Sequence, residues 1–307
     1  MYNIERITKD SLKDLLPLYR LSFHKRYHIE YIQQKFDTLP FGAEYMGYIA
    51  YYNKIAVACY AVFPCRMAYM GKTILAAQSG DTMTHPDHRK KGLFIQLALK
   101  TFELSKENGI KLIFGFPNDN SYNGFIEKLS WKHTESMNLY KIKINTLPIA
   151  KVCQKSRLLA IIYKVYIKII LTLHKTSTSF ESSVNRKESI VLEANTDYYN
   201  YKTYGESFVL NIWKVKVWSK INGALLVGDI EQTSRKNTKS LLKNLKTLAF
   251  IIGCRHIIFS FSKGEYWDIE LAKYLKPVNG FPIAYFDLGS ELPLQKLAFS
   301  LSALDTF

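Results

Sequence analysis

A strongly basic turn between an apolar strand and an amphipathic helix constrains this chain more than any other feature. The run Gly80-Asp-Thr-Met-Thr-His-Pro-Asp-His-Arg-Lys-Lys-Gly-Leu-Phe94 leads from the strand end into the helix, where apolar residues recur at helical spacing up to Glu107. Backbone N–H groups at a helix N-terminus point outward and, with the helix dipole, can hold a phosphate. The segment therefore predicts an anion site at a strand-to-helix junction.

The elements around this turn predict a mixed α/β domain over residues 1–147. Two short helices are expected within residues 1–37, the first capped by Ser11. Three antiparallel strands are expected between Tyr45 and Thr84, with turns at Asn53-Lys54 and Gly71-Lys72. The elements expected after the helix are a buried strand, a short helix and a closing strand, at residues 111–117, 121–129 and 131–144.

The last third of the chain repeats the first in outline. Aligning Asp229 with Asp81 and Phe259 with Phe114 gives separations of 30 and 33 residues, so the second copy is about three residues shorter. The shortening is placed at the turn, where Thr233-Ser-Arg-Lys-Asn-Thr-Lys replaces the basic segment. A duplicated fold explains this pattern, with chance similarity as the alternative, and predicts a second domain over residues 189–307.

Residues 148–188 are expected to connect the two domains. A helix predicted from Ile149 to Lys175 carries Arg157, Lys164, Lys168 and Lys175 on one face, so it is amphipathic and not a transmembrane span. We expect this cationic face to be solvated, with contact to an anionic membrane surface as the alternative. The serine-rich residues 176–188 are expected to form a polar linker.

The charge balance limits the partners of the chain. With 42 Lys and Arg against 26 Asp and Glu, the 307 residues carry a net charge of +16, which suits nucleic acid, an anionic membrane, or small polyanions such as nucleotides and coenzyme A. The four cysteines form no C-x-x-C pair, so neither zinc nor a disulfide framework is indicated. The N-terminus lacks the apolar core of a signal peptide, and a cytoplasmic location is expected.

Two motifs resemble the GNAT acyltransferase superfamily. Arg89-x-x-Gly92-x-Phe94 resembles its Arg/Gln-x-x-Gly-x-Gly/Ala pyrophosphate loop, and Gly115–Trp131 resembles its fifth strand, fourth helix and closing Lys-x-Gly-Phe. Order and spacing match over residues 1–145. The resemblance implies a GNAT fold, α/β with a mixed sheet, in the N-terminal half and a degenerate GNAT-like domain in the C-terminal half.

The resemblance also implies where acetyl-coenzyme A, or another acyl-coenzyme A, would bind without a metal. The ligand would lie where the fourth and fifth strands splay apart. Backbone groups at Met83 and Thr84 would hold the pantetheine arm and thioester carbonyl, and residues 89–94 the pyrophosphate. The residues implied to bind it are Met83, Thr84, Arg89, Lys90, Lys91, Gly92, Leu93, Phe94, Asn118, Asn120 and Phe125.

The catalytic groups of the family are only partly matched. Phe94 replaces a small residue of the loop, and Ile126 stands where the family has the tyrosine that protonates the leaving thiolate. Tyr122, one helical turn earlier, is the substitute acid; a structural aromatic, or no protein acid at all, are the alternatives.

The general base of the family is also not clearly matched. Gln78 falls where some members have a glutamate, so it is assigned to substrate binding. Asp81 is the candidate base or amine-orienting group. The alternative is a structural role, in which Asp81 bonds the unpaired N–H groups of the splayed strand. His24 is a substrate-binding candidate, because the first two helices of the family border the acceptor site. Phe307 could supply a terminal carboxylate only if the tail folds back.

The expected function is acyl transfer to the amine of a nucleotide-linked amino sugar, such as a dTDP-3-amino-3,6-dideoxyhexose. Tandem GNAT folds with one degenerate copy resemble such enzymes, and two polyphosphate ligands would account for the basic charge. The alternatives are a peptide or small-molecule amine as acceptor, a FemAB-like transferase that uses charged tRNA, and a non-catalytic coenzyme A-binding module. The coenzyme A loop argues against the tRNA alternative, so no nucleic-acid partner is expected.

Overall fold

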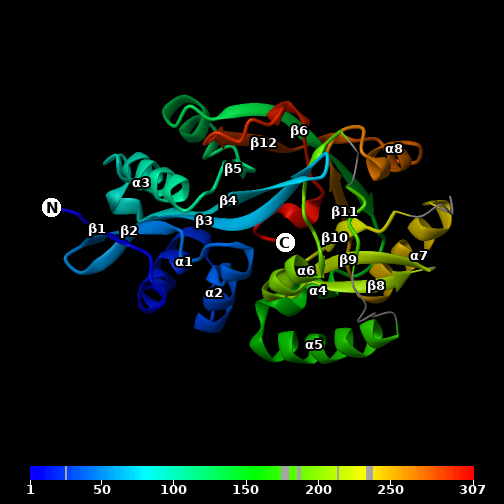
Figure 1. The fold of residues 1–307 in the computed structure, drawn as a ribbon. Coiled ribbons are helices and arrows are strands. Elements are labelled where there is room, and N and C mark those ends of the chain that lie inside the picture. Colours follow the sequence, from blue (N-terminus) through cyan, green and yellow to red (C-terminus); the bar gives the residue numbers. More distant parts are fainter. Residues whose placement is uncertain (25, 174–179, 185–187, 213, 233–237) are drawn as a thin grey trace. The chain divides into compact units, whose positions relative to one another are not determined.

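The computed structural model describes residues 1–24, 26–173, 180–184, 188–212, 214–232 and 238–307. The chain forms two compact units, each built from two segments (Figure 1). Unit 1 comprises residues 1–135 and 282–297, and unit 2 comprises residues 136–281 and 298–307. Each unit contains a mixed sheet with helices packed on it, as the mixed α/β prediction requires.

The sheet of unit 1 is antiparallel except at one pair of strands. Its strands lie in the order β1, β2, β3, β4, β5 and β12, and only β4 and β5 run parallel to one another. Their bounds are β1 (Asn3–Arg6), β2 (Gly47–Tyr52), β3 (Ile55–Tyr69), β4 (Lys72–Thr84), β5 (Leu112–Gly115) and β12 (Val278–Asp287).

The two predicted hairpin turns are confirmed. Asn53 and Lys54 have φ angles of 49° and 64°, and Met70 and Gly71 have 47° and 79°. Two successive residues with positive φ form the turn whose twist matches that of paired strands. These turns set the register of β2, β3 and β4, so the predicted three-stranded meander is confirmed.

Helices cover both faces of this meander (Figure 1). Helices α1 (Leu15–Phe23) and α2 (Ile29–Phe36) pack on one face and α3 (Leu93–Glu107) packs on the other. Residues of β3 alternate between the two layers, with Ala58, Tyr60 and Val62 toward α3 and Cys59, Ala61 and Phe63 toward α1 and α2. An unbroken apolar run therefore forms a strand because both of its faces are buried.

Four local features differ from the sequence-based expectation. Strand β1 was not predicted, and the 3-10 helix Asp10–Asp14 precedes α1. Ser11 exchanges hydrogen bonds with Thr8 and does not cap α1. The short helix expected at 121–129 contains a π-helical turn at Gly124–Lys128.

Unit 2 repeats the element order of unit 1. Strands β8 (Phe208–Ile212), β9 (Val215–Ile221) and β10 (Leu225–Ile230) form an antiparallel meander, which α7 (Thr238–Ile251) and the parallel strand β11 (His256–Phe261) follow. Strand β6 (Lys132–Lys143) pairs with β11. The shorter elements of the unit include β7 (Ile190–Leu192), α6 (Thr196–Lys202) and α8 (Tyr266–Ala272).

Each of the two meanders has a bulge at or next to an aspartate. The β3–β4 register shifts between Gly80 and Met83, around Asp81, and the β9–β10 register shifts between Val227 and Asp229. Asp229 is fully buried and accepts hydrogen bonds from the hydroxyls of Ser182 (2.5 Å) and Ser183 (2.7 Å). Burial raises the pKa of this carboxyl. The shared bulge supports the alignment of Asp229 with Asp81; residues 233–237 of the altered turn lie outside the described residues.

The segment between the predicted domains is part of unit 2. The single helix expected over 149–175 is two helices, α4 (Ile149–Val152) and α5 (Arg157–Thr172), because Ser156 has an extended backbone (φ −130°, ψ 130°). Residues 180–184, expected in the linker, include Phe180, which is 2% exposed and packs on Trp218. Lys175 of the predicted cationic face lies outside the described residues.

Candidate active site

Strands β4 and β5 separate after three residue pairs. They pair only from Ala76–Leu112 to Gln78–Phe114, while β4 continues to Thr84 and β5 to Gly115. The bulge at Asp81, whose φ is 48°, bends β4 at this point. Beyond Gln78 the edge of β4 is therefore no longer occupied by β5, and its main-chain groups become available to a ligand.

The basic turn ends in an uncapped helix N-terminus. Gly92 precedes α3 with a φ of 77°, and no side chain caps the helix there. An added Cβ at Gly92 would meet no described atom within 4 Å. Arg89, Lys90 and Lys91 are exposed beside it. Free N–H groups, the positive end of the helix dipole and three cations are the features that bind a phosphate. The residues predicted to hold the pyrophosphate fit that group.

Two histidines form hydrogen bonds in the same turn. His85 accepts a hydrogen bond from the Asp87 N–H (3.2 Å), and Nδ1 of His88 lies 2.9 Å from the Tyr2 hydroxyl. Burial, and then Lys91 and His85, lower the pKa of His88. The lowered pKa favours the neutral form of His88, and Arg89, Lys90 and Lys91 carry permanent positive charge in the turn.

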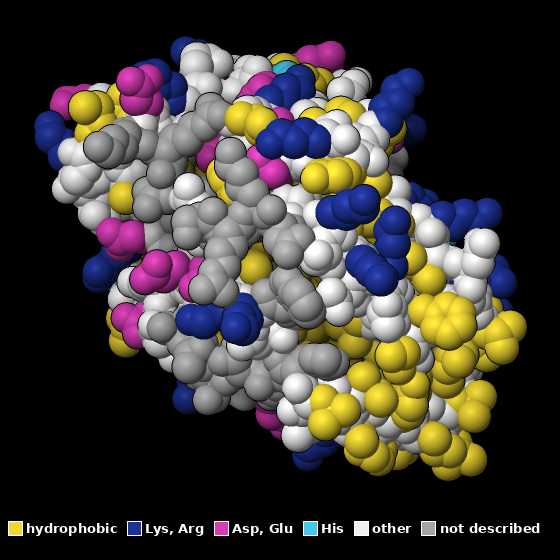
Figure 2. Space-filling view, turned by 90° about the vertical axis from the view of Figure 1, so that its right-hand side faces the viewer, with side chains coloured by type: hydrophobic (Ala, Val, Ile, Leu, Met, Phe, Trp, Pro, Cys, Tyr) yellow, Lys and Arg dark blue, Asp and Glu magenta, His cyan; other side chains and the backbone are white. Residues whose placement is uncertain are grey.

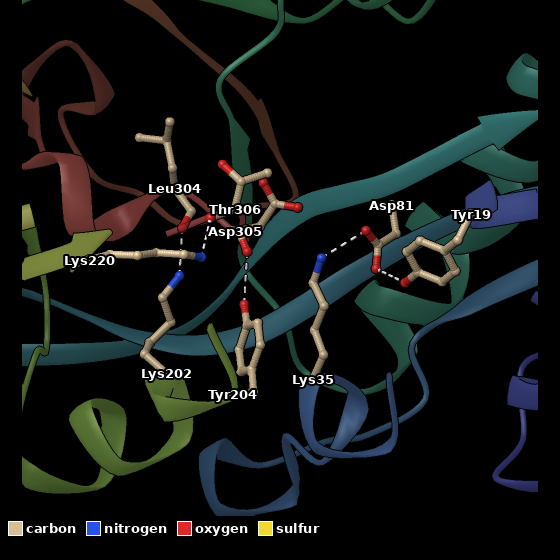
Figure 3. Close-up of polar contacts among 9 residues, drawn as sticks. All are labelled: Tyr19, Lys35, Asp81, Lys202, Tyr204, Lys220, Leu304, Asp305 and Thr306. Atoms are coloured by element: carbon tan, nitrogen blue, oxygen red, sulfur yellow. Dashed lines mark hydrogen bonds and ion pairs between the residues drawn. The ribbon is translucent and has the colours of Figure 1, made fainter. Parts of the chain in front are cut away.

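A buried polar cluster lies under α1 and α2. Asp81 accepts hydrogen bonds from the Lys35 ammonium (2.7 Å) and from the Tyr19 hydroxyl (Figure 3). All three residues are at most 6% exposed. Burial and the Asp81 carboxylate raise the pKa of Tyr19 well above its usual value, so this hydroxyl stays protonated and donates. Both carboxylate oxygens of Asp81 are therefore engaged by donors from α1 and α2.

Gln78 adds an unsatisfied donor close to the strand separation. It is 5% exposed, and its Nε2 has no hydrogen-bond partner among the described residues. Its cross-strand neighbour is Phe63, which packs toward α1 and α2. A buried amide without a partner costs free energy, and a ligand carbonyl would satisfy it.

The segment after β5 is a turn that leads into the π-helical segment. Asn118 Oδ1 accepts the N–H groups of Asn120 (3.0 Å) and Ser121 (3.1 Å), so this side-chain oxygen is used locally. The ring of Tyr122 stands edge-on to His133, and its hydroxyl has no hydrogen-bond partner among the described residues. Phe125 is 6% exposed and packs in the core beside Phe94.

The remaining candidates lie at the ends of elements. Met83 is buried opposite Cys59, and Thr84 pairs with Ala58 at the end of β4. Leu93 is buried as the first residue of α3. His24 is exposed at the C-terminal end of α1, with a φ of 54°.

The structure brings Gln78 and Asp81 toward the face covered by α1 and α2, whereas residues 89–92 lie at the start of α3. Sequence reasoning missed Tyr19 and Lys35, which bind Asp81. Lys35 stands beside Phe36 on an amphipathic helix, where a lysine ordinarily faces water, so the sequence offered no signal for its burial.

In unit 2, the strand edge that corresponds to the open edge of β4 is covered by residues of the same unit. Beyond the paired residues 225–227 and 257–259, Ser300 bridges to Phe261 of β11 and hydrogen-bonds to Asp229 of β10. The ring of Phe307 packs on Gly228 and Trp218. Lys202, Tyr204 and Lys220 donate to the carbonyls of residues 304, 305 and 306 (Figure 3). Within unit 2, residues 298–307 thus cover the part of β10 that corresponds to the open edge of β4 in unit 1.

The separated parallel strands and the uncapped basic helix match the two features that the predicted acyl-coenzyme A site requires. Residues 3–134 match the family profile described as "Acetyltransferase (GNAT) domain". This stretch of the chain is similar to a GNAT acetyltransferase domain, and the match supports an acyl-coenzyme A N-acyltransferase activity. The domain implies an acyl-coenzyme A as co-substrate and an amine as acceptor.

Solved structures share the fold at low sequence identity. A GCN5-related N-acetyltransferase from Kribbella flavida is 13% identical with a TM-score of 0.60, over 94% of this chain and 72% of that one. A conserved protein from Enterococcus faecalis is 14% identical with a TM-score of 0.57, over 94% and 73%. A protein from Pyrococcus horikoshii is 12% identical with a TM-score of 0.54, over 99% and 94%. No curated protein matches the sequence significantly.

Two further properties bear on function. Within the described residues, no three His, Cys, Asp or Glu side chains are grouped so as to hold a metal ion. None of the helices in the described part of the chain is long and apolar enough to cross a bilayer.

Proposed function

We propose that unit 1 transfers an acyl group from acyl-coenzyme A to a primary amine bound toward α1 and α2. Two features carry this proposal. The pairing of β4 with β5 ends at Gln78, and the basic turn that follows β4 leads into an uncapped helix start at Gly92. The strand edge supplies main-chain hydrogen bonds for an extended arm. The helix start supplies an anion site for the pyrophosphate.

Each group has a definite part in this arrangement. Arg89, Lys90 and Lys91 neutralise the pyrophosphate, and the N–H groups from Leu93 onward bind its oxygens. Main-chain groups at Met83 and Thr84 hold the pantetheine arm and the thioester carbonyl. The Gln78 Nε2 donates to a carbonyl of the bound substrate, which satisfies a donor that lacks a partner in the protein.

The chemistry is a direct transfer. The neutral amine nitrogen attacks the thioester carbonyl carbon, a C–N bond forms, the C–S bond breaks, and the nitrogen loses a proton to solvent water. An N–H of β4 stabilises the negative charge that develops on the carbonyl oxygen. The departing thiolate takes a proton, for which the Tyr122 hydroxyl is the proposed source.

We propose that Asp81 holds β4 in position and does not serve as the general base. A carboxylate that is already bound by Lys35 and Tyr19 is a poor proton acceptor. Its contacts support the structural alternative, in which it fixes the β4 bulge against α1 and α2. A base is also less necessary if the acceptor is a sugar amine with a pKa near the α-amino value of about 8.

For the acceptor, we propose a nucleotide-linked amino sugar. The net charge of +16 supports a second polyphosphate ligand beside coenzyme A. A peptide or small-molecule amine is the alternative acceptor. Ile126, in place of the family's acid tyrosine, favours a second function, that of a non-catalytic coenzyme A-binding module.

Calorimetric titration with acetyl-coenzyme A, followed by thiol-release assays, tests these proposals. The acceptor panel contains nucleotide-linked amino sugars, the same sugars without the nucleotide, peptides and simple amines. Release with the nucleotide sugar alone supports the full proposal. Release with other amines retains the enzyme and rejects the acceptor. Binding without release from acetyl- or longer acyl-coenzyme A supports the binding module, and absence of binding rejects the site.

A further inference from the structure

Helix α5 presents an apolar strip to solvent. Five of its outward residues and the C-cap residue that follows it, which together we call the α5 patch, are exposed by 54–78%. They are Leu158, Ile161, Ile162, Val165, Ile169 and Leu173. At about 100° per residue they lie within an arc of about 120° on the helix. Hydrophobic side chains gather at the lower right of the face in Figure 2, at the height of α5 in Figure 1.

The opposite side of the helix fixes this orientation. Ile167 and Leu171 are 9% and 7% exposed and face into unit 2. The hydroxyls of Tyr163 and Tyr166 donate to the carbonyls of Ile252 and Ile251, both at 2.8 Å. The helix is therefore anchored with one apolar side inward, and the α5 patch is a second apolar side that unit 2 does not cover.

The surroundings of the patch are cationic. Residues 136–180 contain eight Lys and Arg and no Asp or Glu. Lys164 and Lys168 lie between the patch and the buried side of α5, as the helical spacing requires. Lys164 pairs with Glu206 (2.9 Å), but both side chains are largely exposed. Elsewhere in unit 2, Lys141, Lys143, Arg255 and Lys151 add to the burial that lowers the pKa of His256.

This combination is more suitable for a lipid surface than for a protein partner. Protein interfaces carry about one hydrogen bond per 100–200 Å². The patch offers no unused donor: Thr172, the polar residue on the same arc, donates its hydroxyl to the Lys168 carbonyl (2.7 Å). A second copy of the chain would bring two proteins of charge +16 together along lysine-lined edges.

An anionic bilayer complements both features. Helices that lie in the bilayer interface have an apolar face bordered by Lys and Arg, whose long stems reach the headgroups. The sixteen residues of α5 extend about 24 Å, less than the roughly 30 Å of a hydrocarbon core. We propose that unit 2 docks peripherally on anionic lipid membranes, with the α5 patch among the upper acyl chains and Lys168 at the headgroups.

Vesicle co-sedimentation of the full-length protein tests this proposal. The vesicles are phosphatidylcholine alone and phosphatidylcholine with added phosphatidylglycerol, at low and high salt. We expect the wild type to bind the anionic vesicles at least about tenfold more strongly than the neutral ones, and to release them at high salt. Ile162→Ser with Ile169→Ser should reduce this binding about tenfold or more, and Lys168→Glu should reduce it several-fold.

Matched controls come from unit 1. Ile55 is 63% exposed and Lys106 is also exposed, so Ile55→Ser and Lys106→Glu change the same chemistry away from α5. Both should bind vesicles as the wild type does. Circular dichroism and acetyl-coenzyme A titration check that the patch variants remain folded.

Three results would overturn the proposal. The first is no binding of the wild type to either vesicle, and the second is equal binding to neutral and anionic vesicles. The third is patch variants that bind vesicles normally. If the same variants instead abolish self-association in sedimentation velocity without vesicle binding, the patch is a contact between copies of the chain.

Discussion

Gly92 matters both for the backbone conformation of the basic turn and for the approach of the pyrophosphate to α3. Its φ of 77° is a conformation in which residues other than glycine are strained by about 1–2 kcal/mol, and its Cβ position is open. We expect Gly92→Leu to weaken acetyl-coenzyme A binding at least about tenfold, because the side chain would stand where the pyrophosphate approaches the helix N-terminus. Calorimetric titration measures the change.

Gly71 offers a control with the same backbone. Its φ is 79°, its Cβ position is equally open, and it lies in the β3–β4 turn. Gly71→Leu should lose similar stability and retain acetyl-coenzyme A affinity. Equal loss of affinity in the two variants would mean that strain alone, and not the loop, explains the effect.

At Gln78 we expect the stability of the fold and the binding of substrate to favour different side chains. Its buried Nε2 lacks a partner among the described residues, so replacing it with an apolar side chain of similar size removes an unsatisfied donor. We expect Gln78→Leu to leave the free energy of unfolding unchanged or to raise it by about 1 kcal/mol. The same variant should raise the KM of one of the two substrates by about three- to tenfold.

Urea denaturation and initial-rate kinetics give the two quantities for Gln78→Leu. The exposed Gln295 supplies the matched control, since Gln295→Leu should change neither. A destabilised Gln78→Leu with both KM values intact would show that the amide is structural.

At the level of elements, the Lys35–Asp81 pair connects α2 to the bulge of β4. Removing one partner of such a buried pair costs about 3–5 kcal/mol, because the other charge loses its counter-ion. We expect Asp81→Asn and Lys35→Met each to destabilise the protein by this amount. The double variant should lose less than the sum of the two.

Chemical denaturation of the two single variants and the double variant measures this coupling. Lys164→Met is the control, because it breaks the exposed pair with Glu206 and should cost about 0.5 kcal/mol or less. Fully additive losses in the double variant would show that Lys35 and Asp81 contribute independently.

Elements set by local chemistry were predictable, and those set by distant contacts were not. The predicted helix Leu93–Glu107 and both hairpin turns agree with the structure, because glycine, asparagine and apolar spacing act within a few residues. Strand β1 exists through its pairing with β2, which is more than 40 residues away. The break at Ser156 also lacks a glycine or proline signal.

The same limit applies to the site. The basic turn and Gly92 were visible because a strand-to-helix junction with that composition has a direct physical meaning. Tyr19 and Lys35 were not visible, because their burial depends on how α1 and α2 pack on β4. A lysine in an amphipathic helix carries no mark that it will meet a carboxylate 46 residues later.

At the scale of the whole molecule, sequence order and structural units differ. Residues 1–147 were expected to form one domain, yet the sheet of unit 1 includes β12, where Ala284 pairs with Gly115. Phe286 stacks on Phe102 of α3 with ring centroids 4.6 Å apart. All four residues of β5 are buried, so β5 is an interior strand that requires this neighbour.

A fragment of residues 1–147 should consequently be defective by itself. Without β12 its strand β5 has an unpaired apolar edge, which favours aggregation, and the α3 core lacks Phe286. We expect the fragment to be largely insoluble and residues 278–297, co-expressed with it, to restore a soluble complex that binds acetyl-coenzyme A. Residues 278–297 with Phe286→Asp and Ala284→Asp are the control and should not rescue. If the fragment alone is soluble and binds acetyl-coenzyme A, β12 is dispensable, and the GNAT domain is contiguous in sequence after all.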